Sequence, residues 1–460
     1  MRGWLCATVL VAGVFVGIAL ASCTPTVRPT AYEGPLVRWM WSGGVTPTSA
    51  TVVARLRRAE DSVRVVFSRT PRFEIAVASA WQQPDDATDP TVRLEVRGLA
   101  PNMPYFYAVE TPGLRDTAFG RLRTPPRGAH SFTFAAAACA DTGSRSSVFD
   151  SIRTRGPDFF FHLGDAHYEN ISVNSVGVFG DAYDAILTSP TQSLLYQSTP
   201  VAYTWDDHDF GPNDSDRTSP SRSASRIAYQ RYVPHYPLAD QDPAPEDRAI
   251  YQTFVRGRVR FVVTDLRSER DPHTVPLSQR SMLGPQQKAW FKKTLQDATE
   301  PLLIWVSGVP WIAEPDEEGD NWSGYAAERA ELAAFFEESG VAERMVILAG
   351  DAHMIAADDG TNSAGGIPVL QAAPLDRPGS IKGGPYTHGP FAPARFSLTG
   401  SYDGQFGLIT VEDEGGAQIC LTYSGLRLDR SDDEVEELLR LTHCVDVPDR
   451  LFDGPILGDG

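Results

Sequence analysis

Residues 132–141 read Phe-Thr-Phe-Ala-Ala-Ala-Ala-Cys-Ala-Asp, and residues 158–168 read Asp-Phe-Phe-Phe-His-Leu-Gly-Asp-Ala-His-Tyr. Each stretch begins with an apolar run of strand length and ends in side chains that ionise or bind metals. A helix is predicted between them, from Ser146 to Arg155. A strand, a helix and a second strand in this order predict an α/β domain with parallel strands. Polar residues that follow such strands meet at one edge of the sheet.

The same alternation continues toward the C-terminus, and it predicts an α/β unit over residues 130–425. Further strands are predicted at 250–265, 302–309 and 345–348, amphipathic helices at 285–296 and 326–338, and a hairpin from 406–411 and 418–423. Residues 426–460 are predicted to be a C-terminal helix and tail. The helix, at 432–442, starts with acidic residues and ends near Arg440 and His443, as the helix dipole favours.

The segment before this unit has a different pattern. Short alternating or β-branched runs lie at 37–41, 50–56, 62–67 and 91–96, without a helical period between them. Such spacing over residues 32–124 predicts a β-sandwich. The sequence Gly98-Leu-Ala-Pro-Asn-Met-Pro-Tyr-Phe-Tyr107 resembles the tyrosine-corner region of fibronectin type III-like domains. An immunoglobulin-like or fibronectin III-like sandwich is therefore expected.

Composition restricts the classes of partner. The chain has 460 residues, with 41 basic and 59 acidic side chains and a net charge of −18. This balance argues against nucleic-acid binding by bulk charge and suits hard cations held by carboxylates. Five cysteines in a chain of this length exclude a disulfide scaffold.

The N-terminus has the features of an export signal. Arg2 is followed by an apolar run over 5–20 and then by Leu20-Ala-Ser-Cys23, which resembles a bacterial lipobox. The resemblance implies a signal peptide at 1–22, a lipid on Cys23, a linker at 23–31 and a place in the cell envelope. A plain cleavable signal and an uncleaved anchor helix are the alternatives.

Four polar clusters lie more than 200 residues apart at their extremes, and three of them directly follow strand-like runs. Three adjacent carboxylates repel one another unless a cation neutralises them. A donor set of thiol, phenol, imidazole and carboxylate suits a transition metal beside a harder ion. The clusters are Cys139-Ala-Asp141, Gly164-Asp-Ala-His-Tyr168, Trp205-Asp-Asp-His-Asp209 with Asn213, and Gly350-Asp-Ala-His353.

In this order the clusters resemble those of the alkaline phosphatase D (PhoD-like) family of metallophosphatases. Intervening segments agree with the resemblance, namely Asp265-Leu-Arg-Ser-Glu-Arg270 and Leu283-Gly-Pro-Gln-Gln-Lys-Ala-Trp290. The resemblance spans about residues 32–425. It implies a metallophosphatase-type α/β sandwich, with two central sheets flanked by helices. In the sequence this unit follows the N-terminal β-sandwich.

The resemblance also implies a site that holds Fe³⁺ and Ca²⁺. Cys139 and Tyr168 are expected to bind the iron, and Asp165 to bridge between metals. The harder sites are then expected to be completed by Asp207, Asn213, Asp351 and His353.

The resemblance implies a phosphoesterase that hydrolyses phosphate monoesters or diesters by in-line attack of hydroxide. The N-terminal signal adds that it is exported, and we expect a monomer. His208 is expected to protonate the leaving group. Arg267 and Arg270 are expected to clamp the phosphoryl group, with surface salt bridges as the alternative. Two other functions stay open: a diesterase or phospholipase D-like activity on envelope phospholipid or polymer, and a non-catalytic envelope-binding lipoprotein.

Two cysteines remain once Cys6 leaves with the signal, Cys23 takes lipid and Cys139 takes metal. Cys420 and Cys444 are therefore expected to form a disulfide between the hairpin and the C-terminal helix. Two buried free thiols are the alternative. The disulfide would close a loop of 24 residues, for which the chain-entropy model gives about 3–4 kcal/mol of stabilisation.

Overall fold

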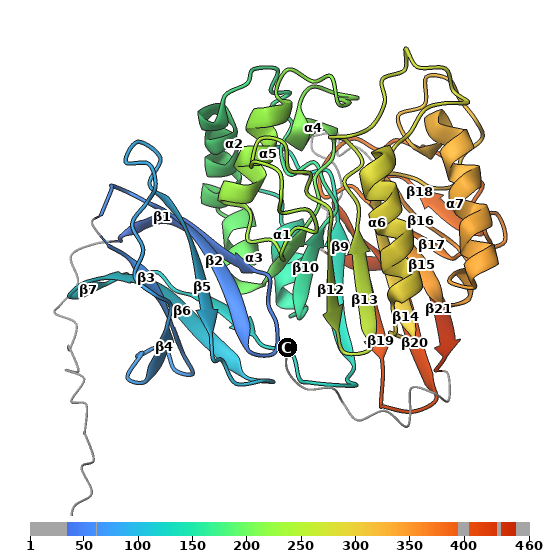
Figure 1. Cartoon of the computed structure of the whole chain (residues 1–460). Coiled ribbons are helices and arrows are strands. Elements are labelled where there is room, and N and C mark those ends of the chain that lie inside the picture. The colour runs from blue at the N-terminus through green and yellow to red at the C-terminus, as the bar shows by residue number, and fades with distance from the viewer. Residues whose placement is uncertain (1–34, 61, 394–403, 430–433, 448–460) are drawn as a thin grey trace, which may run out of the picture.

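The computed structural model describes residues 35–60, 62–393, 404–429 and 434–447 (Figure 1). These residues form a mixed α/β fold with three sheets. The nine-stranded sheet has the order β21-β20-β19-β9-β10-β11-β1-β2-β5. Its strands are β1 Val37–Gly43, β2 Ser49–Leu56, β5 Thr91–Arg97, β9 Phe132–Ala137, β10 Phe159–His162, β11 Val201–Tyr203, β19 Gly404–Glu412, β20 Gln418–Leu428 and β21 Val435–Asp446.

The seven-stranded sheet has the order β12-β13-β14-β15-β17-β16-β18. β13, β14, β15 and β17 are parallel to one another, as the predicted strand–helix alternation requires. The predicted strand at 250–265 divides at Gly257 into the antiparallel pair β12 and β13. The strands are β12 Gln252–Arg256, β13 Val259–Val263, β14 Leu302–Gly308, β15 Met345–Ala349, β16 Ile355–Asp358, β17 Val369–Ala372 and β18 His388–Phe391.

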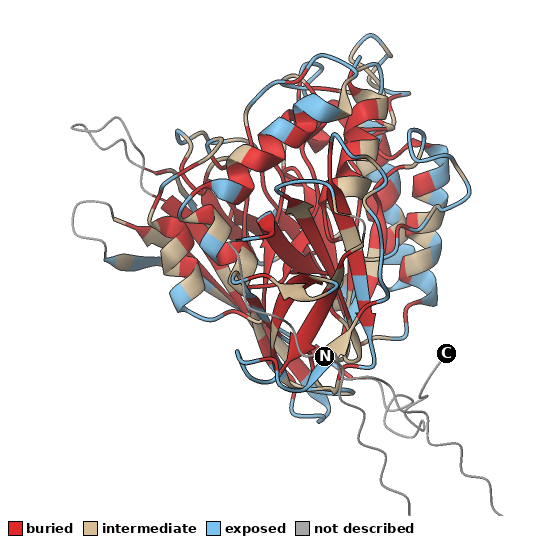
Figure 2. Cartoon of the chain, turned by 90° about the vertical axis from the view of Figure 1, so that its left-hand side faces the viewer, coloured by how far each residue is buried: buried red, intermediate tan, exposed pale blue. Residues whose placement is uncertain are grey.

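The two sheets pack face to face. Successive side chains of a strand point to opposite faces, so each central strand contributes to two apolar clusters. Phe134 on β9 and Phe159 on β10 share one apolar cluster with Phe261 and other residues of the seven-stranded sheet. Their chain neighbours Ala135 and Phe160 belong instead to the cluster formed with helices on the outer side. Strands buried on both faces explain the unbroken apolar runs. Figure 2 shows this buried interior in red.

Helices cover the outer faces of both sheets. α1, α2, α3 and α5 pack on the nine-stranded sheet, and α6 and α7 pack on the seven-stranded sheet (Figure 1). The predicted helices at 146–155, 285–296 and 326–338 correspond to α1, α6 and α7. The helices are α1 Val148–Thr154, α2 Val176–Thr188, α3 Gln192–Ser198, α4 Asp207–Phe210, α5 Arg222–Tyr232, α6 Gly284–Asp297 and α7 Ala326–Ser339, with 3₁₀ turns η1 Trp322–Tyr325 and η2 Ala342–Arg344.

The N-terminal strands are divided between two sheets. β3 Arg64–Ser68, β4 Ala76–Ala78, β6 Pro104–Thr111, β7 Leu114–Arg115 and β8 Gly120–Arg123 form the smaller sheet. An apolar cluster joins this sheet to β1, β2 and β5. β1 also pairs in parallel with β11 at Gly43 and Val201, so the nine-stranded sheet continues into the N-terminal region. The fibronectin III-like class stays a prediction. At the predicted corner, the hydroxyl of Tyr105 accepts a bond from the Ala100 amide at 2.9 Å.

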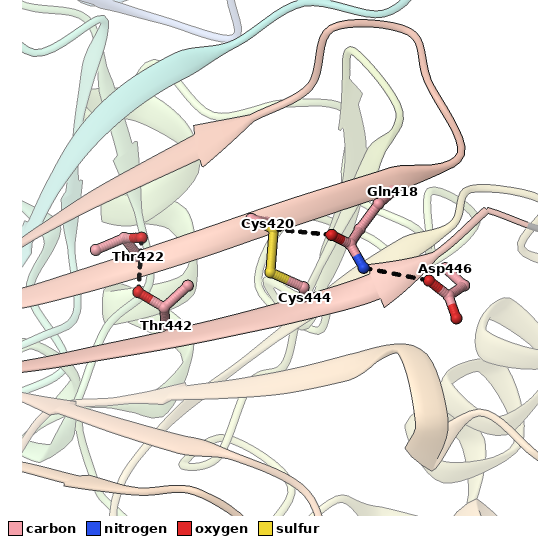
Figure 3. Close-up of a disulfide and its surroundings, with 6 residues drawn as sticks. All are labelled: Gln418, Cys420, Thr422, Thr442, Cys444 and Asp446. Carbon is pink, nitrogen blue, oxygen red and sulfur yellow. Dashed lines mark hydrogen bonds between the residues drawn. A yellow bond between two sulfur atoms is a disulfide. The ribbon is translucent and has the colours of Figure 1, made fainter.

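The C-terminal helix prediction is wrong. Over its described part the segment at 432–442 belongs to the strand β21, which pairs with β20 along its length. Cys420 and Cys444 are direct neighbours across these strands and form a disulfide with an S–S distance of 2.05 Å (Figure 3). Hydrogen bonds between Thr422 and Thr442 and between Gln418 and Asp446 flank it in Figure 3. Pairing with β20 outweighs the helix-like placement of charges.

The signal peptide at 1–22, the linker at 23–31, Cys23 and the tail from 448 onward lie outside the described residues. Within the described ranges, no helix has both the length and the apolar character needed to cross a membrane. The predicted monomeric state stays a prediction.

Candidate metal centre

The four predicted clusters meet at one edge of the two sheets. Cys139 follows β9, Asp165 follows β10, Asp207 opens α4 directly after β11, and Asp351 follows β15. Asp165, Asp207 and Asp351, together with neighbouring loops, surround a cavity of about 350 Å³. The residues that line the cavity are Asp165, Tyr168, Asn170, Asp207, His208, Asn213, Asp351, His353, Arg377 and Lys382.

The backbone at this edge adopts a conformation that side chains other than glycine rarely take. The φ angles are 63° at Cys139, 54° at Asp165, 59° at Asp351 and 49° at His353. Such left-handed residues cost free energy and concentrate at functional sites. Four of the predicted metal ligands are therefore held in place by a strained backbone.

One group of ligand atoms combines thiol, carboxylate, imidazole and phenol. Single donor atoms of Cys139, Asp165 and His353 lie within 4.8 Å of one another. The Tyr168 hydroxyl lies 2.9 Å from Asp165 Oδ2 and 2.9 Å from His353 Nε2, and Cys139 Sγ lies 3.7 Å from the same carboxylate oxygen. Soft and hard donors in one group fit a transition metal.

Two adjoining groups are richer in carboxylates. Asp165, Asp207 and His208 form one, and Asp207, Asp214 and Asp320 form the other, each with donor atoms within 4.8 Å. Asp165 therefore belongs to two of the three groups. A carboxylate shared in this way has the placement that a bridging ligand needs.

Asp165 and Cys139 lack a cationic partner in the described residues, although Lys382 pairs with Asp351 and Arg267 reaches Asp207. Burial, and then the carboxylates of Asp207 and Asp206, raise the pKa of Asp165 well above its usual value. Burial, and then Asp165, raise the pKa of the Cys139 thiol. Asp351 Oδ2 is buried and lacks a hydrogen-bond partner. A bound cation would neutralise these groups and use the free oxygen, so the residues fit a metal.

Surrounding groups orient the donors. The carboxylate of Asp209 accepts a bond from the Ala166 amide at 2.8 Å and another from the Asp165 amide at 2.5 Å, which fixes the loop after β10. Lys382 Nζ lies 2.6 Å from Asp351 Oδ1 and leaves Oδ2 open. Partners of this kind typically set the geometry and affinity of metal sites.

His208 faces the cavity beside the carboxylates. Its Nδ1 lies 2.9 Å from the side-chain oxygen of Asn170, and its ring centroid lies 4.0 Å from that of Tyr168. With Nδ1 donating to Asn170, Nε2 is the nitrogen left to exchange a proton. Burial lowers the pKa of His208, and Asp207 and Asp209 oppose that shift.

Arg267 and Arg270 do not line the cavity, contrary to the predicted clamp. Arg267 is fully buried and binds both oxygens of Asp320 at 2.9 Å, and it also pairs with Asp206. Arg270 pairs with Asp320 and contacts the ring of Tyr325. Both guanidinium groups are thus occupied in ion pairs that are buried and not on the surface, and Arg267 also lies 3.8 Å from Asp207 of the cavity wall.

The cationic residues in the cavity are Arg377 and Lys382, which the motifs do not include. The Arg377 guanidinium lies 3.9 Å from the centre of the Tyr168 ring and pairs with Asp141. Asn170 and Asp320 belong to none of the four clusters, and Asp214 closes the third cluster without having been predicted as a ligand. The only available signal was the Arg-Pro-Gly and Lys-Gly-Gly composition of the loop at 377–384.

Comparison with known proteins places this site in a family of phosphatases. Residues 134–372 match the model of the PhoD-like phosphatases, and residues 27–126 match the model of their N-terminal domain. The first match covers more than half of the chain, and the chain belongs to the PhoD-like phosphatase family.

Two solved structures share the fold. A PhoD structure superposes with a TM-score of 0.72 at 18% identity, covering 91% of this chain and 92% of that chain. The purple acid phosphatase PPD1 from yellow lupin (Lupinus luteus) seeds gives a TM-score of 0.56 at 13% identity, covering 91% and 75%. No curated protein sequence matches the chain. The family match therefore indicates a phosphoesterase-type hydrolase, and the two structures show that the fold is shared.

Proposed function

We propose that the protein is an exported, metal-dependent phosphoesterase that hydrolyses phosphate monoesters or diesters. The observation that carries the proposal is the cavity itself. Its walls combine the carboxylates of Asp165, Asp207 and Asp351 with the cationic side chains of Arg377 and Lys382. The carboxylates suit hard cations, and the cationic groups suit an anionic ester.

The residues that would hold the metals follow from the donor groups. Cys139 and Tyr168 would bind Fe³⁺, and Asp165 would be shared with a harder Ca²⁺ site. His353 was expected at the harder sites, but we assign it to the iron because it shares a donor group with Cys139 and contacts Tyr168. Asp207, Asn213 and Asp351 would complete the harder sites. When bound, such cations offset the charge of the phosphoryl group and make a water molecule acidic enough to act as the nucleophile.

The protein side chains have three tasks in this account. Arg377 and Lys382 attract the anionic ester and orient its non-bridging oxygens. His208 gives a proton from Nε2 to the departing alkoxide, while its hydrogen bond to Asn170 holds the ring. Asp209 keeps the loop of Asp165 in position through two backbone amides.

Export and lipid anchoring through Cys23 belong to the same proposal. The disulfide between Cys420 and Cys444 agrees with an oxidising compartment, where such bonds persist. Membrane fractionation of wild type and Cys23→Ala tests the anchor. The wild type should sediment with membranes and the variant should not, and equal partitioning of both contradicts lipidation.

The catalytic proposal is tested with the purified protein and two substrates, p-nitrophenyl phosphate and bis(p-nitrophenyl) phosphate. Turnover of either one that stops on chelation and returns with metal supports the phosphoesterase. A rate on the bis ester far above that on the monoester identifies a diesterase. Absence of turnover on both, with metal still bound, favours a non-catalytic envelope lipoprotein.

A further inference from the structure

The N-terminal region carries a charge opposite to that of the whole chain. Residues 35–127 contain 13 arginines, no lysine and nine acidic side chains, whereas the chain as a whole has a net charge of −18. The smaller sheet of this region lies at the left-hand end of the molecule in Figure 1. The region therefore favours a different class of partner from the rest of the protein.

One side of the smaller sheet is turned away from the core. Val65 of β3 and Leu122 of β8 belong to the apolar cluster that joins this sheet to β1, β2 and β5. Because side chains alternate along a strand, their chain neighbours Arg64 and Arg121 point to the opposite side. Phe106 of β6 lies between two residues of the cluster and therefore points the same way as the two arginines.

Guanidinium groups and aromatic rings alternate on this outer side. The Arg121 guanidinium lies 5.3 Å from the ring centre of Phe106 and 5.9 Å from that of Phe119. The Arg64 guanidinium lies 4.4 Å from the ring centre of Trp81. Trp81 and Phe119 are 41% and 37% exposed. The surface therefore presents positive charge and apolar rings together.

The loop between β3 and β4 adds to the same side. Its Phe73 shares a small apolar cluster with Val66 and Ala108 of the sheet, and the Arg115 guanidinium lies 5.0 Å from the Phe73 ring centre. Ile75, at the end of the loop, is 87% exposed. We call this side of the sheet and its loop the arginine face, after Arg64, Arg69, Arg72, Arg115, Arg121 and Arg123.

The charge of the arginine face is only partly balanced. Glu110 pairs with both Arg64 and Arg115, and Glu74 lies 3.9 Å from Arg72. The other three arginines of the face are exposed and form no ion pair with any residue that the structure describes. Such a surface attracts an anionic partner.

The described chain begins beside this sheet. The Val37 amide donates to Asp116 Oδ2 at 2.6 Å, and Asp116 directly follows β7. Cys23 and Pro35 are 12 positions apart in the sequence. An extended chain spans at most about 3.6 Å per residue, so a lipid on Cys23, as proposed above, would keep Pro35 within roughly 40 Å of the membrane.

We propose that the arginine face docks on the surface of a membrane that contains anionic phospholipid. The guanidinium groups would pair with lipid phosphates. Ile75, Trp81 and Phe119 would enter the interface between headgroups and acyl chains, where aromatic and apolar side chains are favoured. No residue that lines the cavity of the metal centre belongs to this face, so docking leaves the cavity free. The inference goes beyond the proposed function and does not depend on catalysis.

The first test measures sedimentation with vesicles. Protein that starts at Thr24 has no site for the lipid and keeps every described strand and helix, the first of which begins at Val37. At about 50 mM salt we expect about tenfold more binding to vesicles of phosphatidylglycerol and phosphatidylcholine than to phosphatidylcholine alone, and release at about 500 mM salt. Equal binding to both kinds of vesicle, or binding to neither, overturns the proposal.

The second test reverses charge on the arginine face. Arg121→Glu combined with Arg123→Glu should lower the partition onto anionic vesicles by about tenfold or more. Arg97→Glu combined with Arg440→Glu is the matched control, because both arginines are exposed and lie on β5 and β21, outside the face. An equal loss of binding in the two double variants would reflect bulk charge and overturns the docking face.

The third test removes an apolar side chain. Ile75→Ser should lower the partition onto anionic vesicles by about tenfold, whereas Val255→Ser, at a position 43% exposed on β12, should leave it unchanged. Unchanged binding in both this variant and the charge-reversed one overturns the docking face. Hydrolysis of p-nitrophenyl phosphate by the same preparations separately tests the proposed function, because vesicle binding without turnover contradicts only that function.

Discussion

Two buried clusters of charge lie next to each other in this protein, and they are built in opposite ways. The metal-centre cluster consists of Cys139, Asp165, Asp207 and Asp351, which are groups of one sign. The ion-pair cluster behind it places Arg267 and Arg270 on Asp320 and Asp206. Both are almost inaccessible to water, with Asp165 2% exposed and Arg267 fully buried.

The two clusters differ in how their carboxylates are neutralised. In the ion-pair cluster each acid meets a guanidinium group, and Arg267 and Arg270 lower the pKa of Asp320 against the effect of burial. In the metal-centre cluster burial and neighbouring carboxylates raise the pKa of Asp165. Protein cations neutralise the ion-pair cluster, whereas Asp165 and Cys139 have no such partner among the described residues and fit a bound cation.

Replacement of Asp165 should have the largest effect on metal binding and turnover. Asp165→Asn removes the carboxylate that belongs to two ligand groups, and we expect metal binding and turnover to be lost together. Because enzymes accelerate reactions by about 10⁶-fold or more, only a background rate should remain. Metal analysis and phosphate release measure the two effects. A variant with full metal content and wild-type turnover contradicts the assignment.

His208→Ala should separate chemistry from metal retention in the same cluster. General acid catalysis contributes about 10²–10⁴-fold, so kcat should fall by that factor while the metal content is kept. The loss should be smaller for aryl esters, whose leaving groups need no proton. Loss of metal in this variant would instead make His208 a ligand, which its place beside Asp165 and Asp207 also permits.

The ion-pair cluster should respond in stability. Arg267→Met leaves Asp206 and Asp320 without their common partner, and we expect the free energy of unfolding to drop by about 3–5 kcal/mol. Lys293→Ala is the control, because Lys293 pairs with Asp297 on the surface and should change stability by about 0.5 kcal/mol or less. Chemical denaturation measures both. Equal effects of the two substitutions would show that burial does not distinguish these pairs.

The pH dependence of the metal-free protein should differ in sign between the two clusters. Burial raises the pKa of Asp209, which braces the metal-centre loop, from 3.8 to about 6. A raised folded-state pKa contributes stability in acid that is lost as the pH rises from 3.8 to about 6. The lowered pKa of Asp320 gives the opposite contribution, which is present above pH 3.8 and lost as the pH falls below that value.

The measurement is denaturation of chelated protein from pH 3 to pH 7. Asp209→Asn should reduce the fall in the free energy of unfolding between pH 4 and pH 6, and it should leave the loss of stability below pH 4 unchanged. Arg267→Met should instead reduce the loss of stability below pH 4. If Asp209→Asn has no effect in either pH range, the carboxyl of Asp209 does not carry the raised pKa.

Local patterns predicted most of the central fold. The apolar runs at 132–138 and 158–163 were correctly expected to be buried strands, because strands covered on both faces need no alternation. The prediction of a helix at 432–442 is wrong because the charges of this segment imitate a helix dipole. Its pairing with β20 cannot be read from the segment's own sequence. The pairing of β1 with β11 joins residues over 150 positions apart and is equally invisible locally.

The part of the candidate site whose ligands directly follow strands was predictable, and the part contributed by a loop without a motif was not. The predicted donors Asp165, Asp207 and Asp351 line one cavity, and Cys139 lies next to Asp165, because the strands before them end at one edge. Arg377 and Lys382 reach the cavity from a loop without a motif. Arg267 and Arg270 carry the right charge for a clamp, but only the tertiary structure shows that Asp320 occupies them.

The most direct test of the account is the joint measurement of metal content and ester hydrolysis before and after chelation. The account predicts iron together with a harder divalent ion in the purified protein, and turnover of p-nitrophenyl phosphate or its bis ester that disappears on chelation and returns when both metals are restored. Protein that contains no tightly bound metal, or turnover that survives complete removal of metal, would contradict it.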